Sequence, residues 1–544
     1  MLQAGRKFAE LAGRRKQPSP QRTQGIAMPS QQGGINALNG VSSDNLRDAL
    51  YMDNLIPAEY GNAVRKGYRE WCPPIPNGDG IKTIIPFNSR LDDLTDISKL
   101  FAVTSDGIYD ITVANVAPVR VLEWPNKSTR AGWVSWTNYV TVAGPFLLLC
   151  DLQNGYYVYN GTTNTWTPGD ISGPSPAEAT LDFVTVFKNR VWLVQQDSGT
   201  AWFLQPGAIS GAAEKFEFGN KFKYGGYLKA MYNWTLDGGQ GIDDYLVAIS
   251  DAGDMVIYQG EDPKTVGKWE MRGVYFLGKS PRNRRIGSEF GGDLLLLSTY
   301  GIMLASKLVA GMPLGDSSVS ITAKINSRLN DVMQRTLNEF GWEMKLFPRE
   351  QLMLVIMPKE IGVPYQQYVY NIQTQGWCRF VGVPIKTAEV FRGDLFMGSQ
   401  DNRIFRYEGY ADNVLLEDNG ESSYAVDWQL LTMFSSYGGP SFKRVQFIRP
   451  QFLAGIPPAF FVEARYDFDI ERIPNAPPYV GPGTTVWDTG IWDVDQWGGG
   501  YTRTGPPIGT LGMGRHIAIA LRGRSNSETV YVGCDVMLES GGLL

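Results

Sequence analysis

Residues 146–159 read FLLLCDLQNGYYVY: an apolar run, a turn at Asn154-Gly155, and a second run rich in aromatic residues. An Asn-Gly pair between two apolar runs predicts a β-hairpin, because both residues tolerate the positive φ that a tight turn requires. The same strand–turn–strand pattern occurs seven times, with first runs that begin at Leu100, Phe146, Val191, Tyr245, Leu294, Leu352 and Leu395. The second runs begin at Gly107, Gly155, Thr200, Asp254, Gly301, Gln367 and Arg403. The spacings lie between 43 and 58 residues. Such a period with several short strands per unit is the signature of a β-propeller, since one blade cannot bury its two faces alone.

The repeats predict an all-β chain with a β-propeller of about seven strand-pair units over residues 75–415. Beyond it the pattern changes to longer alternating runs, such as AVDWQLLTMF and TVYVGCDVMLES, so we expect a β-sandwich-like platform domain over 420–544. One inserted helix is predicted over 321–337, and it either caps the propeller's own face or contacts another subunit. The helix prediction rests on apolar residues at helical spacing, namely Ile321, Ile325, Leu329, Val332 and Met333.

The N-terminal 32 residues carry six basic residues and one acid, with Pro, Gln and Ser crowded into the second half. We interpret 1–32 as a flexible arm, either without a partner or docked on a neighbouring subunit or on DNA phosphates. Its deletion is expected to spare the folded core. Residues 33–74 form a lead-in segment that docks on the β domains, with a short helix or strand in LRDALYMDNL and a strand in VRKGY that enters the first sheet.

Composition narrows the class of protein. The 544-residue chain is 43% hydrophobic and 19% charged, with a net charge of −5, which argues against a general nucleic-acid binder. The four cysteines, Cys72, Cys150, Cys378 and Cys534, lie far apart and indicate reduced thiols rather than disulfides or a zinc site. The apolar stretches are too short for a signal peptide or a membrane span, so we expect synthesis in a cytoplasm.

The catalytic inventory is thin. His516 is the single histidine, which excludes any two-histidine metal or relay site, and we expect it to be dispensable. No nucleophile, zinc-protease, phosphate-loop or EF-hand motif occurs, and we expect no catalytic, cofactor-binding or metal-binding residue and no enzyme activity. Gly-rich stretches contain four further carboxylates, namely Asp243, Asp244, Asp493 and Asp495. They are either a catalytic pair of the kind that glycosidases use or solvated turn residues.

Two segments are candidates for partner contacts. The basic stretch KSPRNRRIG at 279–287 carries Arg282, Arg284 and Arg285, which either form intermolecular ion pairs or lie on a solvated loop. The acidic, Gly-rich stretch WDTGIWDVDQWGGG at 487–500 is either a contact surface or packs under its own sandwich. Its candidate contact residues are Trp487, Trp492 and Trp497.

Short motifs occur in a fixed order at both ends of the chain. The N-terminal ones are Gly33-Gly34-Ile35-Asn36, Asp53-Asn54-Leu55-Ile56-Pro57 and Arg65-Lys66-Gly67-Tyr68. The C-terminal ones are Trp428, Leu430 and Thr432, then FKRVQF, ARYDFD and Glu539-Ser540-Gly541-Gly542. In this order they resemble the tail nozzle or tail hub proteins of short-tailed (podovirus-like) bacteriophages, of the packaged-DNA stabilisation or tail tubular protein B type. The resemblance covers both ends, with seven compatible blades between them.

The resemblance implies a structural protein of the virion tail, a homo-oligomer that is expected to be a hexamer. It implies contact with the tail adaptor, the head-to-tail connector, and with a tail fibre or tailspike. Double-stranded DNA would be retained and then passed through the ring. On this reading the loops 238–244 and 205–225 narrow the channel, and Asp243 and Asp244 repel phosphates. The alternatives are a tail-associated propeller that binds or cleaves glycans, and a cellular propeller scaffold.

Overall fold

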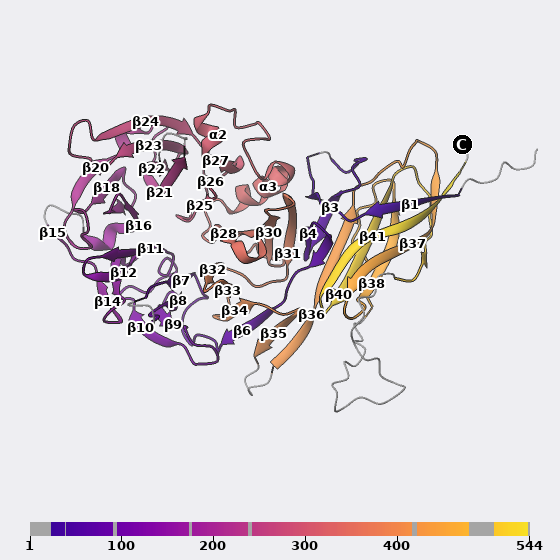
Figure 1. Ribbon diagram of the computed structural model, residues 1–544, viewed down its shortest axis with the longest axis horizontal. Coiled ribbons are helices and arrows are strands. Elements are labelled where there is room, and N and C mark those ends of the chain that lie inside the picture. Colours follow the sequence, from indigo (N-terminus) through magenta and orange to yellow (C-terminus); the bar gives the residue numbers. More distant parts are fainter. Residues whose placement is uncertain are drawn as a thin grey trace, which may run out of the picture.

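The computed structural model describes residues 23–38, 40–90, 95–172, 177–237, 242–415, 421–477 and 505–541. The described residues form two bodies side by side, a disc of radial sheets and an elongated pair of packed sheets (Figure 1). No helix in these ranges is long and apolar enough to cross a membrane.

The disc is a β-propeller with seven blades among the described residues. Blade one contains β7 (Thr83–Phe87), β8 (Lys99–Val103), β9 (Gly107–Asp110) and β10 (Val119–Glu123). Blade two contains β11 (Val134–Thr141), β12 (Gly144–Asp151), β13 (Gly155–Asn160) and β14 (Thr165–Pro168). Blade three contains β16 (Leu181–Phe187), β17 (Arg190–Gln195), β18 (Thr200–Phe203) and β20 (Glu214–Glu217). Blade four contains β21 (Leu228–Asp237), β22 (Ile242–Ser250), β23 (Asp254–Gly260) and β24 (Trp269–Phe276).

Blade five contains β25 (Gly287–Phe290), β26 (Asp293–Ser298) and β27 (Gly301–Leu304). Blade six contains β28 (Glu343–Phe347), β29 (Leu352–Ile356), β30 (Gln366–Asn371) and β31 (Gly376–Val381). Blade seven contains β32 (Thr387–Phe391), β33 (Asp394–Gly398), β34 (Ile404–Tyr407) and β6 (Tyr68–Cys72). The short strands β15 (Ile171–Ser172) and β19 (Gly211–Ala212) pair with each other outside the blades. All seven predicted strand pairs are confirmed as antiparallel hairpins.

The ring closes because the first and last blades share a hydrophobic cluster. The inner strands contact one another in turn from β7 to β21 and from β25 to β32, β21 contacts β26 of blade five, and β32 of blade seven contacts β7 of blade one. Ile84, Leu100 and Phe396 are buried together between these two blades. The outermost strand of blade seven comes from the other end of the propeller sequence, since β6 pairs with β34. This pairing joins the two ends of the propeller sequence by backbone hydrogen bonds. Without β6, the outer edge of β34 would have unpaired N–H and C=O groups.

The predicted helix is confirmed, but it starts later than expected. A 3-10 turn, η3 (Ala323–Ile325), leads into α3 (Asn326–Thr336), whose Leu329, Val332 and Met333 are buried. Ile321 is not helical, because its backbone N–H donates to Ile302 and Ser320 bridges Met303, so these residues extend the edge of blade five. A further short helix, α2 (Ala305–Val309), follows β27 and was not predicted. The remaining 3-10 turns are η1 (Glu178–Thr180), η2 (Gly219–Lys221) and η4 (Pro348–Glu350).

The second body is a sandwich of two sheets that come from both ends of the chain. One sheet contains β1 (Thr23–Pro29), β41 (Thr529–Ser540), β37 (Lys443–Ala454), β39 (Ile508–Gly509), β4 (Leu55–Ala58) and β5 (Gly61–Val64). The other contains β2 (Gly34–Ile35), β3 (Asp48–Asp53), β36 (Glu421–Thr432), β40 (Ile517–Ser525) and β38 (Ala459–Tyr466). Trp428 of one sheet packs on Phe452 of the other, with ring centroids 5.9 Å apart. The predicted sandwich-like fold is therefore present, but it is not confined to residues 420–544, because β1 to β5 also belong to it.

The prediction of a flexible arm over residues 1–32 is wrong for residues 23–29, which form a strand. Residues 1–22 lie outside the described residues, but β1 pairs antiparallel with β41 from Thr23↔Glu539 to Pro29↔Gly533. The lead-in segment 33–74 likewise contributes strands β2 to β5 to the sandwich and β6 to the propeller, rather than docking on finished domains. Local composition did not reveal these strands because their partners lie several hundred residues away in the sequence.

Candidate functional site: the joint between propeller and sandwich

A buried polar network connects the propeller to the sandwich; we call it the joint and define it by Asp53, Asn54, Arg65, Arg379 and Asp412. Strand β31 of blade six pairs with β2 and β3 of the sandwich, and β35 (Ala411–Leu415) pairs with both β6 and β36. The sheet hydrogen bonding is therefore continuous from one body to the other. Because this connection is backbone pairing and not a flexible linker, it holds the two bodies in one orientation.

Asn54 uses its whole side-chain amide in the joint. It has a left-handed backbone (φ 57°) between β3 and β4, a conformation that asparagine tolerates better than most residues. Its Nδ2 donates to the carbonyls of Val381, at 2.9 Å, and Asp427, at 2.7 Å. Its Oδ1 accepts from the Val381 N–H at 3.0 Å and from Arg65 Nε at 3.1 Å. A single 4%-exposed side chain thus joins blade six to strand β36.

Arg65 and Asp53 each form a bidentate ion pair in the joint. The guanidinium of Arg65 donates to Asp412 at 2.8 and 2.7 Å, and the residue is 2% exposed. Asp53 accepts from Arg379 at 2.8 and 3.0 Å and from Gln429 Nε2 at 2.6 Å. Buried charges are costly unless they are paired and hydrogen-bonded, so each pair depends on both partners.

Two glycines permit close backbone approach at the same place. A Cβ on Gly67 would lie 1.9 Å from the carbonyl oxygen of Ala411, and one on Gly34 would lie 2.4 Å from the backbone nitrogen of Trp377. Gly34 also has φ +70°. Both positions therefore require glycine for steric reasons. Together with Asn54 and Arg65, they explain why the N-terminal motifs have their particular residues.

The structure brings the three N-terminal motifs together, and it places two of the three predicted partner-contact arginines, Arg284 and Arg285, inside the propeller. Arg284 is buried and pairs with Asp182, while Arg285 pairs with Glu343 at 3.1 Å and donates to the Lys82 carbonyl at 2.9 Å. Burial raises the pKa of Asp182 to about 6, although Arg284 opposes the shift. The prediction that Arg284 and Arg285 contact a partner is wrong, because both are engaged inside the propeller. Arg282 is exposed, over the ring of Phe340.

The two segments predicted as channel loops, 238–244 and 205–225, contain strand residues. Residues 238–241 lie outside the described residues, and β22 starts at Ile242, so Asp243 and Asp244 belong to a strand. Asp244 is half-buried, pairs with Lys188 and accepts from Thr235 Oγ1 at 2.9 Å. The hydrogen bond from Lys188 lowers the pKa of Asp244. The segment 205–225 was expected as a projecting loop, but it contains β20 of blade three. Trp487, Trp492, Trp497, Asp493 and Asp495 lie outside the described residues.

His516 directly precedes β40, and its imidazole stacks on Phe468 with centroids 4.9 Å apart. Its backbone N–H, rather than the ring, donates to Asp467 Oδ1 at 3.0 Å. We expect His516→Gln to change the free energy of unfolding by about 1 kcal/mol or less, because the side chain is 35% exposed. Thermal unfolding of the variant beside the parent chain checks this. A loss several times larger would mean that the stacked ring supports the sandwich.

Within the described ranges, no group of three or more His, Cys, Asp or Glu side chains is placed to hold a metal ion. All four cysteines are free and buried. Burial raises the pKa of Cys72 and of Cys534 to about 12. These thiols are therefore protonated at neutral pH and are poor nucleophiles.

No family model matches the chain, and no curated protein matches it. Among solved structures it is similar to the computationally designed Ika8 protein, with 8% identity, coverage of 66% of this chain and 96% of that chain, and a TM-score of 0.34. It is also similar to YCF48 in a structure with D1 peptide, with 12% identity, 66% and 98% coverage, and a TM-score of 0.34. A third match is BBS1N in complex with ARL6DN, with 13% identity, 44% and 73% coverage, and a TM-score of 0.27. The fold assignment rests on the sheets described above and not on these similarities.

Proposed function

We propose that this chain is a structural subunit of the tail nozzle, or tail hub, of a short-tailed bacteriophage. In this role it forms a ring at the distal end of the tail, retains the packaged DNA and conducts it during ejection. The observation that carries the proposal is the joint. The N-terminal motifs that resemble this family converge there, from Gly34 on β2 to Asn54 and Arg65, and unite propeller and sandwich in one body. A ring that contains pressurised DNA needs subunits whose domains do not move apart.

The geometry also indicates where the conduit would run. Inner-strand residues of blades two to six surround a cavity of about 160 Å³ at the propeller centre. This volume is on the order of five water molecules, far too small for a duplex. Arg285 and Glu343 form an ion pair in its wall. In the proposed ring the DNA would therefore pass between subunits, and the tail adaptor and a fibre or tailspike would bind the outer surfaces.

The proposal predicts a ring whose mass is a small multiple of the 60.3 kDa chain, with six copies expected. Light scattering on the purified chain, with and without a tail adaptor protein from the same genome, followed by electron microscopy, measures the assembly. Mass spectrometry and antibody labelling of virions then locate the chain, with the tail tip as the expected position. A chain that remains monomeric with the adaptor and is missing from virions would refute the proposal. Cleavage of a glycan by the purified chain would favour the enzyme class instead.

If the end of the β21–β22 hairpin lines the channel, changing the charge there should change DNA ejection. Asp244→Lys would place a second cation beside Lys188, and in combination with Asp243→Lys it adds positive charge to this edge of blade four. If the edge lines the conduit, the double variant should slow DNA ejection in low salt and less so in high salt. Single-particle ejection kinetics measure the effect. Lys188→Glu, with the opposite sign, is the matched control and should not slow ejection.

A further inference from the structure

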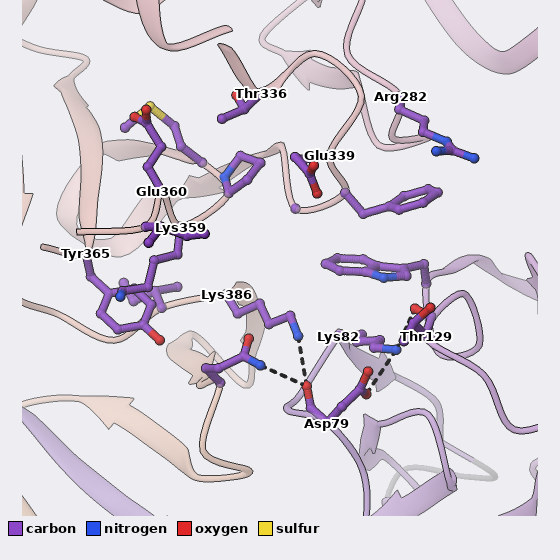
Figure 2. A pocket seen from close by; sticks show the side chains of 18 of the residues that line it. Asp79, Lys82, Thr129, Arg282, Thr336, Glu339, Lys359, Glu360, Tyr365 and Lys386 are labelled. Atoms are coloured by element: carbon purple, nitrogen blue, oxygen red, sulfur yellow. Dashed lines mark hydrogen bonds and ion pairs between the residues drawn. The ribbon is translucent and has the colours of Figure 1, made fainter. Parts of the chain in front are cut away.

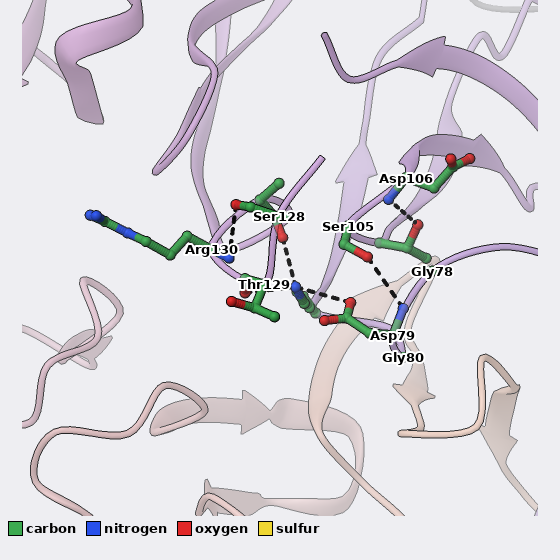
Figure 3. Close-up of polar contacts among 12 residues, drawn as sticks. Gly78, Asp79, Gly80, Ser105, Asp106, Ser128, Thr129 and Arg130 are labelled. Atoms are coloured by element: carbon green, nitrogen blue, oxygen red, sulfur yellow. Dashed lines mark hydrogen bonds and ion pairs between the residues drawn. The ribbon is translucent and has the colours of Figure 1, made fainter. Parts of the chain in front are cut away.

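A large pocket opens at the centre of one propeller face; we call it the axial pocket. It has a volume of about 780 Å³ and is lined by connections that enter blades one, two, five, six and seven, and by the end of α3 (Figure 2). A cavity of this size is typical of ligand sites. In one wall, Lys82 connects the Gly78–Gly80 turn to the 128–130 turn. Figure 3 shows these two turns with their polar contacts. Lys82 Nζ contacts Asp79 at 3.0 Å and donates to the Thr129 carbonyl at 2.8 Å.

The axial pocket carries an excess of positive charge. Its basic lining residues are Lys82, Arg130, Arg282, Arg335, Lys359 and Lys386, against the acids Asp79, Glu339 and Glu360. Asp79 is paired with Lys82, and Glu360 with Arg335 at 2.7 Å. Among the residues that the structure describes, no carboxylate lies within 4.0 Å of the charged groups of Arg282, Lys359 or Lys386. The pocket therefore presents cations that lack an anionic partner.

Aromatic rings position these cations. Trp133 and Phe340 stack with centroids 5.7 Å apart, and Arg282 lies 5.0 Å from the Phe340 centroid. Lys386 lies 5.5 Å from the ring of Trp133, and Lys359 lies 4.9 Å from that of Tyr365. Burial, with the charge of Lys82 nearby, lowers the pKa of Lys386 to about 8. Cations that aromatic rings already hold in place bind an anion with less loss of side-chain entropy.

The mixture of side chains selects the chemistry of the ligand. With three acids among its lining residues, the pocket has only a small excess of positive charge, which suits a ligand with a few spaced carboxylates better than a densely charged nucleic acid. Ile361 at the rim is fully exposed, and Pro358 and Phe340 add apolar surface. Spaced carboxylates on an apolar, aromatic backbone fit this lining better. The chain contains such a sequence in WDTGIWDVDQW at 487–497, which has three aspartates, three tryptophans and no basic residue.

We propose that the axial pocket receives segment 487–497 of a second copy of the chain. The described chain on either side of this segment lies on the sandwich, because Ile473 is buried among its strands and the Gly505 N–H donates to the Pro450 carbonyl. The residues that line the pocket belong to the propeller. The contact therefore joins the sandwich of one copy to the propeller of the next. A head-to-tail contact of this kind generates a ring when its rotation closes. The inference deepens the proposed function and rests on it only for the assembly that results.

The first test measures binding of the isolated segment. A fluorescein-labelled peptide of residues 485–499 is titrated with full-length chain whose own segment carries Asp488→Asn, Asp493→Asn and Asp495→Asn. We expect saturable anisotropy that falls with added salt, and at least about tenfold weaker binding after Arg282→Glu with Lys359→Glu. Lys223→Glu is the matched control, because Lys223 is also an exposed lysine over a tyrosine, 5.5 Å from Tyr224, but lies outside the pocket. It should leave the affinity unchanged.

The second test exchanges the charges in the intact chain. Arg282→Glu with Lys359→Glu should reduce self-association, and adding Asp488→Lys, Asp493→Lys and Asp495→Lys should restore it. Circular dichroism verifies the fold, and Arg282→Gln with Lys359→Gln replaces the first pair if it misfolds. Peptide binding that persists in both pocket variants, or a stronger affinity for a single-stranded oligonucleotide than for the peptide, would overturn the inference. Rings that assemble without peptide binding would refute the inference and leave the nozzle proposal intact. Peptide binding by a chain that never enters virions would support the inference and refute the nozzle proposal.

Discussion

Replacing Arg65 with alanine should be among the most damaging single changes in this chain, with a loss of about 3–5 kcal/mol in the free energy of unfolding. The guanidinium is 2% exposed and donates to both oxygens of Asp412, to Asn54 Oδ1 and to the Lys66 carbonyl. Its removal leaves a buried carboxylate and an amide oxygen short of a donor. We expect the calorimetric transition to move to lower temperature and to split, because propeller and sandwich then lose a shared support.

An exposed ion pair of the same type provides the control. Arg524 lies 2.5 Å from Asp427 in the sandwich, but the two side chains are 36% and 48% exposed. Arg524→Ala should therefore cost about 1 kcal/mol or less. Arg65→Met combined with Asp412→Leu removes both buried charges and should recover much of the loss. Equal effects for Arg65→Ala and Arg524→Ala would show that the joint does not hold the two bodies together.

The propeller was predictable from sequence because its information is local. Each hairpin brings together residues within about one period of one another, and turns such as Asn154-Gly155 mark the reversal. Leu352 begins both the predicted and the observed strand β29. The helix could be found from its apolar spacing, although the bridge from Ser320 to Met303 delays its start. Long strands of the sandwich, such as β41, were visible by alternation.

The joint and the partner assignments were not predictable in the same way. The motif residues Asn54 and Arg65 were recognised, but their hydrogen-bond partners Val381, Asp427 and Asp412 lie more than 300 positions away. Arg284 was wrongly expected at the surface, because a basic run in the sequence does not reveal that Arg284 pairs with Asp182 inside the propeller. The axial pocket is lined by residues of five blades and of α3 that lie far apart in the sequence, so no single stretch of sequence indicates it.

Two N-terminal deletions should separate the strand β1 from the residues before it. Deleting residues 1–22 removes all six basic residues of the predicted arm, namely Arg6, Lys7, Arg14, Arg15, Lys16 and Arg22. If this part of the arm makes no contact with the folded core, as its composition predicts, the deletion should leave the melting temperature within about a degree. If the basic residues dock on a neighbour or on DNA, the deletion should weaken assembly or virion incorporation, and the loss relative to the parent chain should be larger in low salt than in high salt, because salt already screens this contact in the parent chain.

Deleting residues 1–32 should instead destabilise the sandwich by several kcal/mol, contrary to the expectation from sequence that the core would be spared. It removes the pairing of β1 with β41 and the buried Met28, whose burial alone is worth roughly 2 kcal/mol. It also removes Gln31, which is fully buried and donates to the Leu46 carbonyl at 3.1 Å. The exposed edge of β41 should promote association between chains. Calorimetry with light scattering compares the two deletions. If they melt alike and neither aggregates, β1 contributes nothing to the sandwich, and any loss of assembly in both would then be due to the basic residues alone.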